Sequence, residues 1–274
     1  MTTPPVALTI AGSDSSGGAG IQADLKTFAA HGVYGTSAIT ALTAQNTQGV
    51  HGVHAVPARF VVAQVEAVLD DLSVAVVKTG MLATVATVRS VAELAAAGRL
   101  PLLVVDPVMV ASSGDRLLEP QAEQFYREAL LPHAYIATPN LHEAEVLLGQ
   151  PIRTLAERHE AARALGDIGP RTVIVKGGHA VTGAEEEAVD VVWDGVTTYE
   201  LRAAWVATDN NHGSGCTFAS AIAAGLARGL SVPAGLRAAK EYVSRSMAGG
   251  VDWRLGAGHG PLDHFAYRAT AAEG

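Results

Sequence analysis

The chain has 274 residues, of which 49% are hydrophobic and 17% are charged, and its formal net charge is −8. This length fits one large α/β domain or two small ones, and the apolar share allows a sizeable core and argues against disorder. The negative charge argues against broad attraction to nucleic acid, so local groups must hold any bound phosphate. The single cysteine excludes an internal disulfide framework and a cysteine-cluster metal site.

The N-terminal segment and the hydropathy of the chain bear on its location. Residues 1–5, Met-Thr-Thr-Pro-Pro, contain no basic region, so we expect no signal peptide. No apolar run reaches the roughly 18 residues that a membrane span needs. We therefore expect a soluble protein of the cytoplasm without a membrane partner.

Apolar runs alternate with amphipathic segments along the chain. We expect strands over residues 6–11, 33–43, 74–77, 102–105, 135–137 and 172–175. We expect helices over residues 21–29, 60–72, 85–97, 122–131, 141–148, 155–165, after 216, over 233–247 and over 261–271. Two further runs, residues 189–193 and 196–201, flank Asp194-Gly195 and predict a hairpin. The alternation predicts one α/β domain over residues 1–274, with a mostly parallel sheet covered by helices on both faces.

Residues 12–20 form a glycine-rich loop between the first strand and the first helix. A P-loop would need a lysine after its glycines, and Gly17 is followed by Gly18 and Ala19 instead. The dinucleotide-binding pattern would need a third glycine where Ala23 stands. Neither nucleotide motif fits, and the alternative is that the loop closes over a small substrate.

Residues 50–56 alternate loosely and predict an edge strand or flap. His51 and His54 lie in this segment and could in principle bind a metal ion. Because no third ligand lies nearby, exposed histidines on a flap are the favoured interpretation.

Polar side chains follow several of the predicted strands. Asp106, Asn140, Lys176 and the loop before Cys216 all stand where a strand or loop ends. Open sheets of this class bind ligands beyond the carboxyl ends of their strands. We therefore expect these groups to share one site.

The segment over residues 210–226 is a loop of small residues that enters a helix. The first turn of a helix leaves N–H groups unpaired at the positive end of the dipole, and Gly213 and Gly215 would let an anion approach. Cys216 would then have a lowered pKa. The alternative is a glycine-rich turn before a buried helix, with Cys216 as a small apolar residue.

Five other side chains admit both a chemical and a structural interpretation. Lys176 could hold phosphate or be a solvated lysine. Asn140 and Glu143, three residues apart at a helix start, suit Mg²⁺ but equally form a capping box. Asp24 and Gln45 could bind a ligand through their planar hydrogen-bonding groups or be ordinary polar side chains at the surface. An anion hole, a lysine, a magnesium pair and a base together indicate phosphoryl transfer.

Seven ordered blocks of the sequence resemble a known family. They are AGSDSSGGAGIQADLKT (11–27), TALTAQNT (40–47), KTGML (78–82), DPVM (106–109), TPNLHEAE (138–145), VKGGH (175–179) and HGSGCT (212–217). They resemble the hydroxymethylpyrimidine and phosphomethylpyrimidine kinases of thiamine biosynthesis, in the ribokinase-like superfamily, from about residue 6 to 250. The resemblance implies a three-layer ribokinase-like sandwich. It also implies ATP-dependent phosphorylation of a pyrimidine hydroxymethyl group and then of the monophosphate.

The resemblance implies roles for residues around the substrate. Gln45 and Asp24 would hydrogen-bond the aminopyrimidine edge and the hydroxymethyl region. Met81 and Val108 would pack on the ring, and Gly12 would line the pocket.

The resemblance also implies roles around the nucleotide. Asn140 and Glu143 match an N-x-x-E motif that organises Mg²⁺ around the phosphates, through water and phosphate, and Lys176 would contact the ATP phosphates. Gly213, Ser214 and Gly215 would stabilise the transferring phosphoryl group, with Cys216 as the base. Serine at 214 replaces the family's usual threonine and keeps the hydroxyl group.

Two alternative functions stay open on the sequence. The first is a pyridoxal kinase, as the sole or a second activity, because one group of pyridoxal kinases also has cysteine at the position of Cys216; sugar kinases carry aspartate there. The second is a catalytically silent pyrimidine-binding protein. The resemblance also implies a homodimer.

Overall fold

The fold is built on one mixed sheet, which the computed structural model describes together with its helices over residues 3–109, 121–177 and 187–265. The described strands run in the order β3-β2-β1-β4-β5-β6-β7-β8-β9. Their bounds are β1 Val6–Asp14, β2 Tyr34–Asn46, β3 Gly49–Ala55, β4 Val74–Thr79, β5 Val104–Val105, β6 Ile136–Ala137, β7 Thr172–Val175, β8 Glu187–Trp193 and β9 Thr198–Ala204. Strands β2, β1, β4, β5, β6 and β7 pair in parallel in that order, while β3, β8 and β9 are antiparallel to their neighbours.

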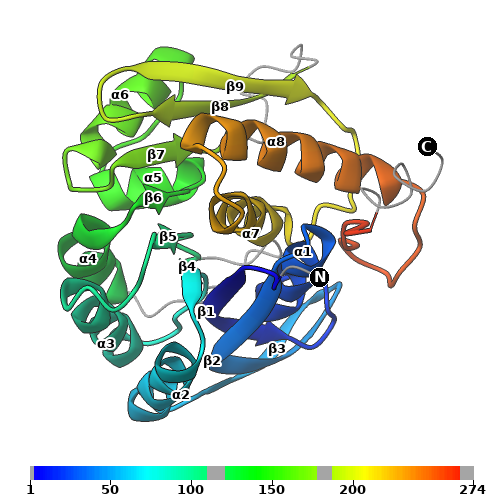
Figure 1. Ribbon diagram of the computed structural model, residues 1–274. Helices are drawn as coiled ribbons and strands as arrows, with labels where there is room; N and C mark the ends of the chain where they lie inside the picture. Colours follow the sequence, from blue (N-terminus) through cyan, green and yellow to red (C-terminus); the bar gives the residue numbers. More distant parts are fainter. Residues whose placement is uncertain (1–2, 110–120, 178–186, 266–274) are drawn as a thin grey trace.

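Helices cover both faces of this sheet (Figure 1). Their bounds are α1 Gly20–Ala30, α2 Ala58–Asp71, α3 Val85–Ala96, α4 Ala122–Phe125, α5 Leu141–Leu148, α6 Leu155–Gly166, α7 Ser214–Ala227 and α8 Val232–Gly249. Helices α1, α7 and α8 share one apolar core with the sheet, and α2 to α6 share the other. The α/β class with helices on both faces is therefore confirmed. Among the described residues, no helix is long and apolar enough to cross a membrane.

Several element boundaries differ from the predicted ones for local reasons. Strand β1 continues to Asp14, because Ser13 and Asp14 still pair with β2 beyond a bulge after Ala11. Strand β5 starts only at Val104, since Leu102 has a positive φ of 40° that breaks the ladder. The predicted helix over 122–131 becomes α4, a π-helical turn (Tyr126–Leu130) and a 3₁₀ turn (Leu131–His133).

The predicted hairpin and the predicted edge strand are confirmed. Strands β8 and β9 form a hairpin whose turn is held by Asp194, which accepts hydrogen bonds from the N–H groups of Val196 and Thr197. Strand β3 is an edge strand on which both His51 and His54 are exposed. No cluster of three metal-ligating side chains occurs among the described residues. Of the helix predicted over 261–271, residues 261–265 are not helical, and the rest lies outside the described residues.

A buried ion pair joins the sheet to two helices on one face. Lys78 on β4 lies 2.9 Å from both carboxylate oxygens of Asp24 on α1, and both side chains are fully buried. The same carboxylate accepts hydrogen bonds from Thr9 on β1 and Ser220 on α7, each at 2.6 Å. This network fixes helices α1 and α7 relative to strands β1 and β4.

We predict that Lys78→Met lowers the free energy of unfolding by about 3–5 kcal/mol, because it leaves the Asp24 carboxylate buried without its cation. Chemical denaturation measures the loss. Arg99→Met is the matched control, since its ion pair with Asp70 is exposed and should contribute about 1 kcal/mol or less. Equal small losses for the two variants would contradict the structural role of the Asp24–Lys78 pair.

Candidate active site

A pocket lies at the carboxyl edge of the parallel strands, where the predicted polar residues meet. Its lining comes from the ends of β1, β2 and β4, from the loops after β5, β6 and β7, and from the start of α7. The predicted site residues that line it are Gly12, Gln45, Met81, Val108, Asn140, Glu143, Lys176, Gly213, Gly215 and Cys216. The polar groups at the strand ends therefore line one pocket, as the strand-end argument expects.

Asp24 and Ser214 do not line this pocket. The carboxylate of Asp24 is fully buried and accepts its four hydrogen bonds from Lys78, Thr9 and Ser220, so it does not reach a substrate. The predicted substrate contact for Asp24 is corrected accordingly to a structural ion pair. Ser214 is the first residue of α7, and its N–H donates to the carbonyl of Asn211 at 3.1 Å.

The start of α7 has the geometry of the anion hole that the loop over residues 210–226 predicts. Gly213 precedes the helix with a φ of 84°, and a Cβ there would lie 1.9 Å from the carbonyl oxygen of Gly18. Only glycine fits such a position. The N–H groups of Gly215 and Cys216 donate to no other described residue, so they are available to an anion at the positive end of the helix.

The thiol of Cys216 differs from its prediction. We expected a lowered pKa, but burial raises the pKa of Cys216 to about 11 against the opposing effects of Lys78 and of the Gly20 N–H group. The carboxylates of Asp24 and Asp106 add to the increase. The lowered pKa was therefore wrong, because desolvation and two nearby carboxylates outweigh the positive end of the helix. At neutral pH the group is a thiol.

Lys176 stands opposite the anion hole and is paired. Its Nζ atom lies 2.8 Å from Asp106 Oδ1, which also accepts a hydrogen bond from Thr138 at 3.0 Å. Burial lowers the pKa of Lys176, but the carboxylates of Asp106 and Glu143 outweigh burial and raise it above its ordinary value. The lysine therefore presents a fixed positive charge to the pocket, 3.3 Å from where a Cβ on Gly215 would stand.

Asn140 and Glu143 form the capping box at the start of α5. Glu143 N–H donates to the Asn140 side chain, and Asn140 N–H donates to the Glu143 carboxylate, both at 2.8 Å. Burial raises the pKa of Glu143 to about 7, opposed by Lys176 and helped by Asp106. Each side-chain oxygen used by the cap keeps a lone pair, so the box is compatible with a hydrated cation held through water.

The opposite wall of the pocket is apolar with one amide. Met81 packs with Ala41 and Ala83 in a small cluster against which Val108 lies. A Cβ on Gly12 would meet Met81 Cε at 2.5 Å, so glycine lets the thioether reach the pocket. Gln45 uses its carbonyl oxygen to accept from Thr43 at 3.1 Å, while its side-chain NH₂ donates to no described residue. A flat ring with polar edges suits this wall.

Asp14 and His212 also line the pocket, although neither was among the predicted site residues. They form a buried hydrogen bond between side chains 198 residues apart, His212 Nε2 to Asp14 Oδ2, at 2.8 Å. Burial raises the pKa of Asp14, but hydrogen bonds from His212, Ser16 and Ala19 outweigh it and lower the pKa to about 2. A carboxylate in a glycine loop directly after a strand was the available signal, but its partner depends on the fold.

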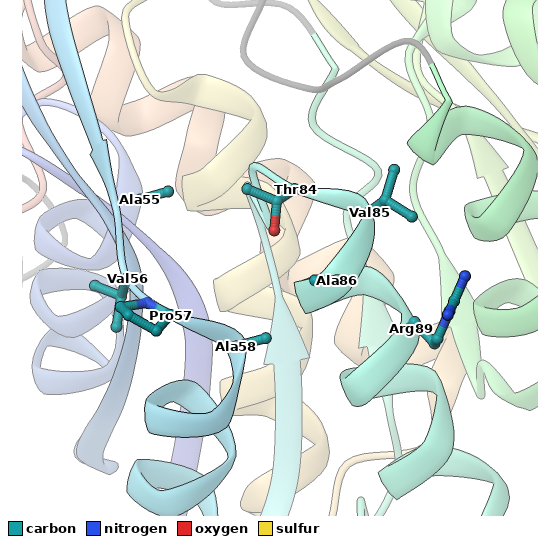
Figure 2. A pocket seen from close by; sticks show the side chains of 8 residues that line it. All are labelled: Ala55, Val56, Pro57, Ala58, Thr84, Val85, Ala86 and Arg89. Carbon is teal, nitrogen blue, oxygen red and sulfur yellow. The ribbon is translucent and has the colours of Figure 1, made fainter.

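A second hollow lies between the end of β3 and the starts of α2 and α3 (Figure 2). Its polar side chains already have partners: Thr84 caps α3 by accepting from the Thr87 N–H group, and the Arg89 guanidinium lies over the Phe125 ring. This hollow therefore offers no cluster of free chemical groups comparable with the pocket at the strand ends.

Solved structures of similar proteins define the class. An ADP complex of Bacillus subtilis pyridoxal kinase is 39% identical with a TM-score of 0.88, covering 97% of this chain and 99% of that one. A phosphomethylpyrimidine kinase of Clostridium difficile 630 is 40% identical with a TM-score of 0.77, covering 88% and 98%. Together with the anion hole and the lysine, this makes the chain a small-molecule kinase of the ribokinase-like class.

The particular family follows from the sequence comparisons. The family model described as phosphomethylpyrimidine kinase matches residues 14–263. A hydroxymethylpyrimidine/phosphomethylpyrimidine kinase of Streptomyces coelicolor is 49% identical over 96% of this chain and 95% of its own length, and one of Synechococcus elongatus is 48% identical over 95% and 97%. The chain belongs to the phosphomethylpyrimidine kinase family, as the seven sequence blocks indicate.

We predict that the Asp14 carboxylate gives the protein part of its acid sensitivity. A pKa lowered from 3.8 to about 2 stabilises the fold above pH 4 by about 2 kcal/mol, and this stability is lost as the pH falls through 2. Asp14→Asn should therefore be less stable at pH 6 and approach the wild type near pH 2, as measured by denaturation at each pH. The exposed Asp252→Asn variant is the control, and parallel curves for Asp14→Asn would contradict the prediction.

Proposed function

We propose that the chain uses ATP to phosphorylate 4-amino-5-hydroxymethyl-2-methylpyrimidine and then converts the monophosphate to the pyrophosphate, in thiamine biosynthesis. One observation carries the proposal: a wall of Met81, Val108 and Gln45 faces an anion hole and a lysine in the same pocket. The wall suits a methylated ring with an amino edge, and the anion hole suits a phosphoryl group. The names of the relatives support the same substrate.

The nucleotide side of the pocket supports ATP as the donor. The free N–H groups of Gly215 and Cys216 would bind the transferring phosphoryl oxygens, and Lys176 would neutralise their charge. A Mg²⁺ ion, held through water by the Asn140–Glu143 pair, would neutralise charge on the phosphates. ADP and AMP-PCP complexes of two pyridoxal kinases with the same fold support this choice.

The two phosphorylation steps make different demands on Cys216. In the first step the hydroxyl oxygen attacks phosphorus and the bond from phosphorus to the leaving ADP oxygen breaks. The hydroxyl proton passes to Cys216 in the small fraction of molecules in which this group is ionised to the thiolate. In the second step the attacking oxygen belongs to a phosphate whose second pKa is about 6, so it is already ionised and needs no base. Only the first step would therefore depend on the thiolate.

We predict that Cys216→Ala lowers kcat of the first step by about 100-fold, the scale of losing a general base, and that of the second step by less than about threefold. Because the pKa of Cys216 is raised to about 11, the first step of the wild type should accelerate as pH rises from 7 to 9, and the variant should lose this slope. Each substrate is assayed separately. Equal losses in both steps would contradict the role of Cys216 as the base. The backbone N–H groups would then be the main source of catalysis, through stabilisation of the transferring phosphoryl group.

We predict that Gln45→Ala raises KM for the pyrimidine with little change in kcat, because its NH₂ group binds the ring edge and not the reacting atoms. Steady-state kinetics with saturating ATP measures both constants. Gln48→Ala is the matched control, since Gln48 is exposed at the tip of the same hairpin and does not line the pocket. A loss confined to kcat would contradict a binding role for Gln45.

The activity itself is tested with a substrate panel. Purified protein, ATP and Mg²⁺ are incubated with the hydroxymethylpyrimidine, its monophosphate or pyridoxal, and mass analysis identifies the products. We expect mono- and pyrophosphate from the two pyrimidines. Absence of any phosphorylated pyrimidine would overturn the proposal, and tight pyrimidine binding by calorimetry without turnover would instead support a silent binding protein.

Pyridoxal phosphorylation is the second candidate, as the sole or an additional activity. It is favoured by structural similarity to a pyridoxal kinase of Staphylococcus aureus in complex with AMP-PCP and pyridoxal, 36% identical with a TM-score of 0.88 over 97% of this chain. The ratio of kcat/KM for the two substrates decides between them, and we expect it to favour the pyrimidine. The cytoplasmic location and the homodimer stay predictions, and light scattering would measure the oligomeric state.

A further inference from the structure

Two segments far apart in the sequence meet beside the pocket through one buried hydrogen bond between side chains. His212 Nε2 lies 2.8 Å from Asp14 Oδ2, and the two side chains are 8% and 3% exposed. Solvent therefore screens this pair weakly. Both residues line the pocket, yet neither has a part in the proposed phosphoryl transfer.

The Asp14 carboxylate also holds residues 15–20 of the glycine loop in shape. It accepts hydrogen bonds from the N–H groups of Ser16 and Ala19, both at 2.8 Å, and of Gly18 at 3.2 Å. These N–H groups point at Asp14 and are not available to a phosphate. One carboxylate thus fixes the shape of the loop and ties it to His212 by charge-assisted hydrogen bonds.

The loop and the start of α7 approach each other at their backbones. A Cβ on Gly18 would lie 2.5 Å from His212 Cδ2, and a Cβ on Gly213 would lie 1.9 Å from the Gly18 carbonyl oxygen. The backbone of His212 is also held, because its main-chain N–H donates to the Gly260 carbonyl at 3.0 Å. A shift of His212 would therefore move both the loop and the first turn of α7.

We infer that the Asp14–His212 pair is a positioning clasp, which holds the glycine loop against the first turn of α7 and so aligns the Gly215 and Cys216 N–H groups with the bound substrate. The two residues act through these groups, so they are positioning residues. A misplacement of 1 Å in such a site can reduce the rate about 100-fold. The kinetic consequence rests on the proposed function, whereas the effect on loop geometry does not.

The first test is a set of variants in the full-length protein. We expect His212→Leu to lower kcat for the hydroxymethylpyrimidine by about 10- to 100-fold, with KM for both substrates within about threefold. His212→Gln, whose amide N–H reaches a similar point, should recover most of kcat. Asp14→Asn combined with His212→Leu should be no slower than the slower single variant, because both remove one interaction.

The matched control is His159→Leu. His159 also hydrogen-bonds a carboxylate, that of Glu200 at 3.3 Å, but it lies on α6 and does not line the pocket. We expect its kcat to match the wild type. Equal loss of kcat in the two leucine variants, or no recovery in His212→Gln, would overturn the clasp.

A second measurement does not depend on the substrate. Hydrogen–deuterium exchange should rise about tenfold or more in peptides covering residues 14–20 and 212–218 of His212→Leu, and not in His159→Leu. Alkylation by iodoacetamide reports on the same turn, since Cys216 is the only cysteine of the chain, and it should accelerate in His212→Leu. If exchange in both peptides is unchanged in His212→Leu, the clasp is overturned whatever the kinetics show. If exchange rises in these peptides but the wild type has no kinase activity, only the proposed function is overturned.

Discussion

The buried Asp24–Lys78 pair is the interaction on which the geometry of the pocket depends. It lies where β1, β4, α1 and α7 meet. Its carboxylate, on α1, accepts hydrogen bonds from Thr9 on β1, Lys78 on β4 and Ser220 on α7. The glycine loop lies just before α1, and the candidate anion hole is the first turn of α7. Fixing the two helices therefore fixes the positions of the loop and of this turn in the pocket. A charge pair with no exposure tolerates little displacement, since each ion would otherwise lie unpaired in an apolar interior.

The pocket balances several charges within a short distance. The positive end of α7 and Lys176 face the carboxylates of Asp106 and Glu143, so the lysine stays charged while burial raises the pKa of Glu143 to about 7. Burial, together with the carboxylates of Asp24 and Asp106, raises the pKa of Cys216 and keeps it a thiol at neutral pH. An incoming phosphate would meet fixed N–H groups and a fixed cation, which is the arrangement that stabilises a transferring phosphoryl group without reorganisation.

The sequence allowed much of the site to be predicted, and its errors share one cause. Strand-end residues such as Asn140 and Lys176 were placed correctly, because parallel strands bring their carboxyl ends to one edge. Asp24 was misplaced and the pKa of Cys216 was predicted with the wrong sign. Both errors concern burial and partners from distant segments, namely Lys78 for Asp24 and Asp106 for Cys216. The position of a residue in its helix gives neither its burial nor its partners from distant segments.

The sequence by itself determined the α/β class, the glycine turns, the hairpin at Asp194-Gly195 and the family, since these depend on local propensity, periodicity and ordered motifs. Only the tertiary structure decided which polar groups line the pocket and which are buried in hydrogen bonds with other groups of the protein. Asp14 illustrates the difference: it is a loop carboxylate in the sequence and the partner of His212 in the fold. Desolvation and pairing act through space over a few ångströms, so they are set by the packed chain and not by residue order.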